Sequence, residues 1–406
     1  MGRVDIIDTR QGSRWTLISG GAGIFIGTYD TAAISAALPR LTDMWHLTSG
    51  EVAALGSAPL LGMIVGSLVA GLYADRWGRR TLLLADFVAF GLAAFASALA
   101  PTFGWFLVCR IMVGLGVGAD YAVIFPYLTE IAVPRHRGKV MALVMWAANF
   151  GMVFAYGLGA LVLSQPQGWR IPLVVGSLLV IPLLLVRQAL PESTLWVRRR
   201  VQSWGGFWRM LAAPKSLKVV SSAAINWFSY QASDQGLSLF LPTMLAAMFQ
   251  SSVANASWRS LLVKAVTIPA ALATIYVIDR WGRRPLQLWG FLGRAVALLG
   301  LGVLLLRDTP AHPSHRLLLM ALLVAAYALG AFGPDKTTVM AAAEQTETAI
   351  RGTAQGIAEA FGRLGGIIGV TGYSLFAFRF GPGAGVLFFG AMTLVGFGVT
   401  ALAPTS

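Results

Sequence analysis

The hexapeptide DRWGRR occurs twice in this chain, once in GLYADRWGRRT at 75–80 and once in YVIDRWGRRPL at 279–284. The two copies stand 204 residues apart, and long apolar runs flank each of them. Charged residues wedged between apolar runs are typical of a short turn that joins two membrane-spanning helices. The repeat therefore indicates two equivalent turns in the same chain.

A second signal recurs in the same order along the chain. Glu130 precedes Arg137 by seven residues, and the Gly138 that follows completes the pattern. Glu344 precedes Arg351 by the same seven residues, 214 positions further on. Two signals that recur in order at similar offsets indicate an internal duplication.

The composition is that of a polytopic membrane protein. Hydrophobic residues make up 56% of the 406 residues, only 12% are charged, and the mean hydropathy is +0.70. Ordinary soluble domains carry about 25% charged residues. The net charge of +14 comes from Lys and Arg between the apolar runs, so we expect no nucleic-acid partner.

Catalytic and metal-binding patterns are missing from the sequence. The single cysteine, Cys109, lies in an apolar run, and the four His residues show no metal-ligand spacing. We find no nucleophile–base set, nucleotide loop or metal cluster. We therefore expect a protein that is not an enzyme and has no cofactor and no metal.

Twelve apolar segments are long enough to cross a bilayer, which requires about 20 residues each. The predicted spans are 16–38, 52–73, 81–100, 105–131, 140–163, 171–190, 219–246, 258–278, 286–306, 317–342, 353–377 and 382–403. The fold class is therefore all-α, with twelve transmembrane helices in two pseudo-symmetric six-helix halves, 1–190 and 219–406. A linker, 191–218, joins them, and its WGGFWRML segment predicts a short interfacial helix.

The loops differ in their content of Lys and Arg. Loops after even-numbered spans carry most of these residues, as at Arg76, Arg135 and Arg198, whereas the opposite loops hold few, such as Arg170. By the positive-inside rule, both termini are cytoplasmic. We expect a multi-pass protein of the cell (inner) membrane, in contact with the lipid bilayer.

Several motifs in the right order resemble the major facilitator superfamily. They are the repeated DRWGRR, the two Glu-to-Arg-Gly turns, RIMVGLGVG at 110–118 and PESTLW at 191–196. The resemblance covers nearly the whole chain. It implies a monomeric secondary transporter that moves a small solute by alternating access between its halves. A non-transporting membrane sensor with the same fold is the alternative.

The resemblance also implies a role for the charges in the turns. We expect them to form latches that hold one conformation and break in the other. The alternative is that these charges only fix the topology and the shape of the turns. The first latch would use Glu130 and Arg137 with Arg79 or Arg80, beside Asp75. The second would use Glu344 and Arg351 with Arg283 or Arg284, beside Asp279.

Ionisable residues inside membrane spans are costly and are functional candidates by default. Asp30 and Arg110 enter the membrane from the same side, at depths that allow a pair. In proton-coupled sugar porters, which this region resembles, the matching Asp and Arg couple transport to protons; a static buried pair is the alternative. Asp120, in GLGVGADY, resembles the Asp of proton-coupled phosphate symporters and is a second candidate for protons.

Polar residues in other spans are candidates for binding the solute. They are Tyr121, Asn149, Trp227, Gln231, Asp234, Gln235 and Arg363. Arg363 suits an anion because its guanidinium is bidentate. Alternatively, Arg363 and Glu359 belong to a compensating cluster with Asp335 and Lys336 in the neighbouring span.

The substrate class follows from partial matches to three branches. The chain lacks the QQxxG run of sugar porters, and Gln231 replaces the Asp of the WFxxD motif in phosphate symporters. The GTYDTAAISA segment resembles the DGFDTAAIGF of aromatic-acid symporters, with Gly27 in place of the first Asp. We therefore expect a proton-coupled symporter of a small polar or anionic metabolite, with a sugar, a polyol or phosphate as alternatives.

Overall fold

A computed structural model describes residues 14–132, 136–165, 167–193, 204–249, 252–307 and 316–402. Residues 194–203 of the predicted linker lie outside this part. The helices of the first half are α1 Arg14–Trp45, α2 Ser49–Trp77, α3 Arg79–Ala98, α4 Phe103–Ile131, α5 Arg137–Val162 and α6 Arg170–Gln188. Those that follow are α8 Trp204–Leu211, α9 Pro214–Phe249, α10 Val253–Ala265, α11 Thr267–Trp281, α12 Arg283–Arg307, α13 Arg316–Phe332, α14 Pro334–Val339, α15 Ala341–Gln345, α16 Arg351–Phe380 and α17 Pro382–Leu402.

The twelve predicted spans are confirmed, and the WGGFWRML segment forms the short helix α8. Ten segments are long and apolar enough to cross a membrane by length and composition. The other two spans, α1 and α9, have 32 and 36 residues but include polar runs. Two spans are interrupted: α10 and α11 meet at Val266, and α13 gives way to α14 at Gly333.

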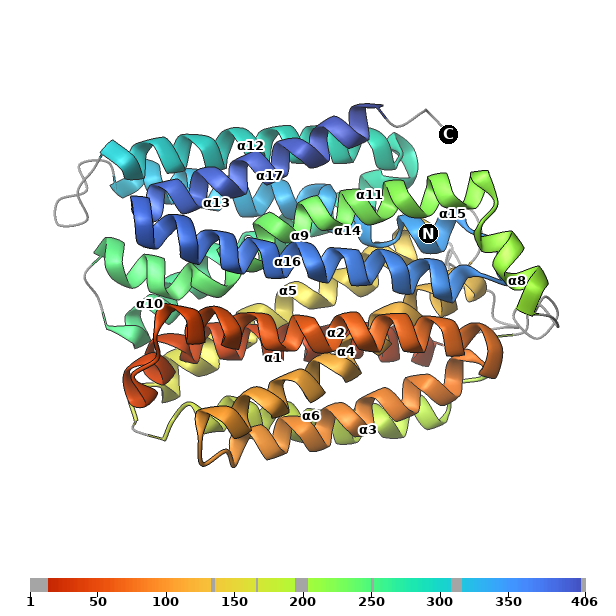
Figure 1. Cartoon of the computed structure of the whole chain (residues 1–406), viewed down its shortest axis with the longest axis horizontal. Coiled ribbons are helices and arrows are strands. Elements are labelled where there is room, and N and C mark those ends of the chain that lie inside the picture. Colours follow the sequence, from red (N-terminus) through yellow and green to blue (C-terminus); the bar gives the residue numbers. More distant parts are fainter. Residues whose placement is uncertain are drawn as a thin grey trace, which may run out of the picture.

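The two halves pack against each other crosswise. Helix α2 of the first half lies against α16 of the second, and α5 lies against α10 and α11 (Figure 1). Equivalent helices therefore exchange partners, as expected for two duplicated halves around a central axis. The sites described below lie where these helices meet.

Glycine allows the two DRWGRR turns to form. Gly78 has a φ of 104° between α2 and α3, and Gly282 has a φ of 82° between α11 and α12. Residues with a Cβ rarely adopt such angles, so each turn needs glycine at this position. The turn places the Asp before it and the Arg after it at the same end of the helix bundle, here called the Arg-rich face.

Glycine also brings α2 and α4 into backbone contact. A Cβ at Gly114 would overlap the carbonyl oxygen of Pro59, and one at Gly118 would overlap that of Met63. Small residues that allow such close approach are typical of helix pairs in membranes. This contact fixes the position of the α4 segment around Gly118, which carries Asp120 and Tyr121.

Candidate functional site

The first latch is a buried ion cluster at the Arg-rich face. The Arg79 guanidinium donates to Asp75 at 2.9 Å and to Glu130 at 2.8 Å. The three side chains are fully enclosed. Arg79 therefore ties the end of α2 to the end of α4 through two charge-assisted hydrogen bonds.

This cluster also joins the two halves. Asp75 accepts hydrogen bonds from the backbone N–H groups of Gly352 and Thr353 at 3.0 and 2.7 Å, at the start of α16. A carboxylate at a helix N-terminus satisfies free N–H groups and opposes the positive end of the helix dipole. Arg351 adds an ion pair to Glu130 at 3.5 Å. The prediction that groups Arg351 in one latch with Glu344 is wrong, because α16 packs against the first half and brings Arg351 to Glu130.

The second latch is smaller and more exposed. Arg283 pairs with Asp279 at 3.3 Å and with Glu344 at 2.7 Å, and 31% of its side chain is exposed. Gly138, at the start of α5, lies against both Asp279 and Arg283. The same arrangement thus occurs twice, with the halves exchanged, but only the first copy is buried.

Three other predicted latch residues lie elsewhere in their turns. Arg80 donates to the carbonyl of Gln188, and Arg284 donates to that of Ala401. Arg137 forms no ion pair with any residue in the described ranges. The second Arg of each RR pair therefore caps a helix end within its own half.

A narrow cavity of about 60 Å³ lies between the halves, in the middle of the bundle. Its wall consists of Gly27, Thr28, Thr31, Met63, Val117, Tyr121, Met145, Ala148, Met152, Trp227, Gln231, Asp234, Gln235, Asp335 and Arg363. Both halves contribute, and a few polar groups converge within an apolar surround, as expected for a small-molecule site. Of the predicted binding residues, only Asn149 lies outside this wall; its amide donates to Trp146 O at 3.2 Å.

Arg363 is the central polar group of this cavity. Its guanidinium lies 4.8 Å from the ring centre of Tyr121 and 5.9 Å from that of Trp227. It also pairs with Glu359 at 3.1 Å. Glu359 accepts two further hydrogen bonds, from Trp227 at 3.0 Å and from Gln355 at 3.2 Å. Glu359 therefore keeps two donors if Arg363 turns to another anion.

Hydrogen bonds between the halves close the cavity at the face opposite the Arg-rich one. Ser35 of α1 donates to the carbonyl of Ser238 on α9 at 2.8 Å, and Tyr156 of α5 donates to the same carbonyl at 3.1 Å. The latches close the Arg-rich face. Contacts between the halves therefore lie on both sides of the cavity.

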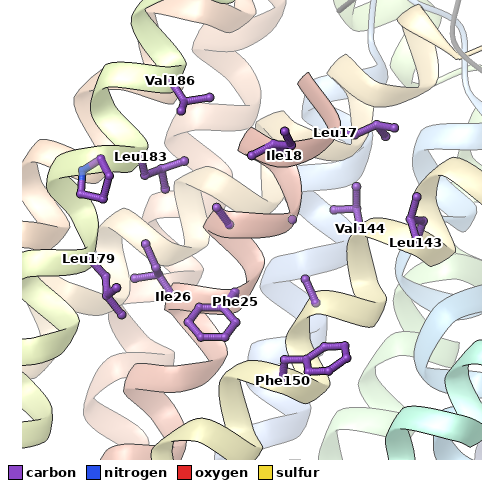
Figure 2. A pocket seen from close by; sticks show the side chains of 14 residues that line it. Leu17, Ile18, Phe25, Ile26, Leu143, Val144, Phe150, Leu179, Leu183 and Val186 are labelled. Carbon is purple, nitrogen blue, oxygen red and sulfur yellow. The ribbon is translucent and has the colours of Figure 1, made fainter. Parts of the chain in front are cut away.

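A second hollow, of about 650 Å³, lies between α1, α5 and α6 (Figure 2). Its lining contains only Leu, Ile, Val, Phe, Pro, Ala and Gly. Ile18 and Phe150 in this lining are 51% and 38% exposed, so the hollow opens on the outer surface. It has no polar side chain with which to recognise a polar solute, so the smaller central cavity is the better candidate.

The repeated latches, the helix order and the central cavity are the features by which this chain can be compared with known proteins. The family model of the Major Facilitator Superfamily matches residues 21–369. The chain belongs to the Major Facilitator Superfamily. The family is one of membrane transporters, and the predicted resemblance is confirmed.

Individual relatives of this superfamily member transport different solutes. The niacin transporter NiaP of Acinetobacter baylyi is 25% identical, over 86% of this chain and 83% of the relative. The D-xylose-proton symporter-like 2 of Arabidopsis thaliana is 28% identical, over 91% and 82%. The solved proton:xylose symporter XylE matches the fold with a TM-score of 0.81 at 21% identity, over 96% and 95% of the two chains.

In this superfamily member, the predicted pair of Asp30 and Arg110 is present. The two terminal guanidinium nitrogens of Arg110, Nη1 and Nη2, each donate to one carboxylate oxygen of Asp30. The two residues are 2% and 1% exposed and lie outside the cavity wall. The pair is therefore a balanced, bidentate link between α1 and α4.

The structure places Asp120 inside the first half, away from the cavity. Its carboxylate accepts from Arg187 of α6, and Arg187 also pairs with Asp86 of α3 at 3.1 Å. Asp86 and Arg187 are not among the residues predicted from the sequence. The signal was present, because each is an ionisable residue within or at the end of an apolar run, but nothing in the sequence shows that they meet.

A corresponding cluster in the second half includes the cavity residue Asp234. Asp234 accepts from Arg294 of α12 at 2.9 Å. The Lys264 ammonium donates to Ser238 at 2.7 Å and lies 3.9 Å from the ring centre of Tyr327. Ser238 in turn donates to Asp234 at 3.4 Å. Arg294 and Lys264 are not among the residues predicted from the sequence. Neither lines the cavity, but both are connected to it through Asp234.

Proposed function

We propose that this transporter is a proton-coupled symporter of a small organic acid, with the central cavity as its binding site. The proposal depends on the position of Arg363, whose guanidinium lies in the cavity wall. Its partner Glu359 accepts hydrogen bonds from two other side chains as well. A solute carboxylate can replace Glu359 on Arg363 without leaving an unpaired buried acid. Such an exchange favours an anionic solute, since a bidentate Arg–carboxylate pair is strong.

Aromatic side chains surround Arg363. Tyr121 and Trp227 flank the guanidinium, and aromatic solutes stack on such rings. Gln231, Gln235 and Asp234 supply further polar contacts on α9. The name of the niacin transporter NiaP supports the same chemical class, so nicotinate is the first solute to test.

Buried carboxylates in the first half are the candidates for the transported proton. Asp30, which Arg110 holds, and Asp120 are both enclosed within the membrane-spanning helices. A carboxylate in this setting is costly to keep charged unless its partner remains in place. Movement of the helices between conformations would change those partners and so release or bind the proton.

The two closures supply alternating access. We propose that the Arg-rich face is cytoplasmic, that both termini lie there, and that the protein works as a monomer in the cell (inner) membrane. Breaking the latches around Arg79 and Arg283 would open the cavity to the cytoplasm. Breaking the hydrogen bonds of Ser35 and Tyr156 would open it to the other side.

A neutral sugar is the second candidate solute. The wall contains Trp227 with Gln231 and Gln235, and amides beside an aromatic ring suit hydroxyl groups. The names of the xylose symporters among the matches favour the same reading. This candidate differs from the first in having no use for the charge of Arg363.

Uptake into proteoliposomes tests the proposal. Purified protein is reconstituted, and labelled nicotinate is added with an imposed pH gradient, alkaline inside. We expect accumulation that a protonophore abolishes, and that nicotinate and benzoate inhibit more strongly than nicotinamide, D-xylose or phosphate. Inhibition by D-xylose alone would support the sugar candidate, and uptake indifferent to the pH gradient would contradict proton coupling.

A further inference from the structure

The buried charges of the first half do not balance. Asp86 and Asp120 share one cation, Arg187, and the three side chains are 5%, 1% and 0% exposed. Arg187 is the charged group that faces them from α6, and α1 faces the cluster with Gly23. One oxygen of Asp86, Oδ2, is buried and has no hydrogen-bond partner in the described structure. The cluster therefore has a net charge of −1 when both acids are ionised, and Asp86 Oδ2 is free to accept a hydrogen bond.

The buried charges of the second half are unbalanced in the opposite sense. Asp234 stands against two cations, Arg294 at 2.9 Å and Lys264 through the hydroxyl of Ser238. Arg294 and Lys264 are 0% and 2% exposed. This cluster has one positive charge too many, and Asp234 connects it to the wall of the cavity.

Three other acids within the described membrane-spanning helices each pair with a single cation. These pairs are Asp30–Arg110, Asp335–Lys336 and Glu359–Arg363. Each of these three pairs has no net charge, whereas the clusters around Asp86 and Asp234 do. An uncompensated charge in a buried, low-dielectric site is strongly unfavourable.

From this balance, and resting on the proposed function, we propose that Asp86 and Asp120 hold the transported proton. We also propose that the cationic surplus of Arg294 and Lys264 balances a solute with one negative charge. The protein then carries one proton with one monoanion, and no net charge crosses the membrane. The proton enters from water on one side, forms an O–H bond on a carboxylate and leaves to water on the other side.

The same balance of charges explains why the proton and the anion must move together. The empty protein has surpluses of opposite sign that cancel, and the protein with both proton and anion is neutral in each half. With the anion alone the interior has a net charge of about −1, and with the proton alone of about +1, which costs free energy in the occluded state. Only the empty and the fully loaded forms therefore cross readily between conformations.

The dependence of transport on membrane potential tests this stoichiometry. Initial nicotinate uptake is measured at one fixed pH gradient, with potassium and valinomycin setting the potential to zero or to inside-negative. We expect equal rates. Faster uptake at the inside-negative potential would mean more than one proton per anion, slower uptake would mean fewer, and either overturns the proposal. Absence of nicotinate uptake at any potential would instead remove the proposed function.

Variants test the assignment of the proton. Asp86→Asn removes the surplus acid, so we expect nicotinate uptake that ignores the pH gradient and slows at the inside-negative potential, while nicotinate exchange continues. Asp86→Glu keeps the negative charge, so nicotinate uptake by this variant should remain coupled to the pH gradient. Normal pH-driven accumulation by Asp86→Asn would overturn the assignment, and nicotinate exchange shows in each case that the variant is folded.

A variant of the second cluster tests the assignment of the anion. Lys264→Gln removes the surplus cation, so we expect the preference for nicotinate over its neutral analogue nicotinamide to fall by about tenfold or more. Both compounds have the same ring, so this ratio reports charge rather than shape. An unchanged ratio in a folded protein would overturn the role of Lys264.

Discussion

At the scale of single residues, the central feature is an arginine with a replaceable partner. Arg363 is 4% exposed, which would normally make it a structural ion pair with Glu359. Glu359 differs from an ordinary partner because Trp227 and Gln355 also donate to it. Removal of Arg363 from Glu359 therefore costs less than it would for a carboxylate with a single donor.

The first prediction concerns the bidentate guanidinium of Arg363. Arg363→Lys keeps the charge but loses bidentate contact, so nicotinate binding should weaken by about 1.5–3 kcal/mol, or about tenfold to a hundredfold. Calorimetry or ligand-induced thermal shift measures this loss. Arg379→Lys is the matched control, since Arg379 is exposed at the end of the same helix, and it should bind normally. Equal weakening in both variants would argue against a specific role for Arg363.

The second prediction concerns Asp30 and Arg110. Asp30→Asn leaves Arg110 buried without its partner, so the protein should lose about 3–5 kcal/mol of stability. The double variant Asp30→Asn with Arg110→Gln removes both charges and should recover most of the loss. Thermal unfolding measures both effects. If the pair is a static link, the double variant also accumulates nicotinate with a pH gradient; its failure to do so would assign the proton to Asp30.

At the scale of helices, close packing of α2 on α4 positions the cavity wall. The third prediction is that Gly118→Ala lowers stability by about 1–3 kcal/mol, because the new Cβ overlaps the carbonyl of Met63. Gly104→Ala, on the same helix but in open space, should be neutral or slightly stabilising. Thermal unfolding in detergent compares them, and equal stability of the two variants would contradict the backbone contact.

The latches act at the same scale, and the two copies differ in strength. Asp75 holds Arg79 and two backbone N–H groups of α16 in a fully buried cluster, whereas Arg283, the partner of Asp279, is partly exposed. The fourth prediction is that Asp75→Asn opens the Arg-rich face more than Asp279→Asn does. Each lost charged hydrogen bond is worth about 1.5–3 kcal/mol when buried and less when exposed.

Spin-label distances measure this opening. Trp77 and Trp281 occupy equivalent places in the two DRWGRR turns and are 65% and 56% exposed, so cysteines there accept labels. Cys109 is the single native cysteine and is replaced by Ser first. We expect a longer-distance population in Asp75→Asn. Unchanged distances in Asp75→Asn would contradict its role as a latch.

At the scale of the whole molecule, the sequence predicts the architecture better than it predicts which side chains meet. Twelve spans and the duplication follow from hydropathy and repeated motifs. The partner of Arg351 does not, because α16 of the second half packs on the first, and sequence spacing cannot show that exchange. Asp86 and Arg187 were missed for the same reason: they are ordinary single charges until α3 and α6 place them on Asp120.

Proton-coupled symport requires that the solute and the proton cross the membrane together. The direct measurement is the internal pH of proteoliposomes that contain a trapped pH indicator, with nicotinate added outside and no gradient imposed. Protein-free vesicles and vesicles with Arg363→Ala correct for passive entry of the acid. We predict acidification above both controls that follows labelled nicotinate uptake, one proton per molecule. Nicotinate uptake by the protein without this added acidification would rule out proton symport.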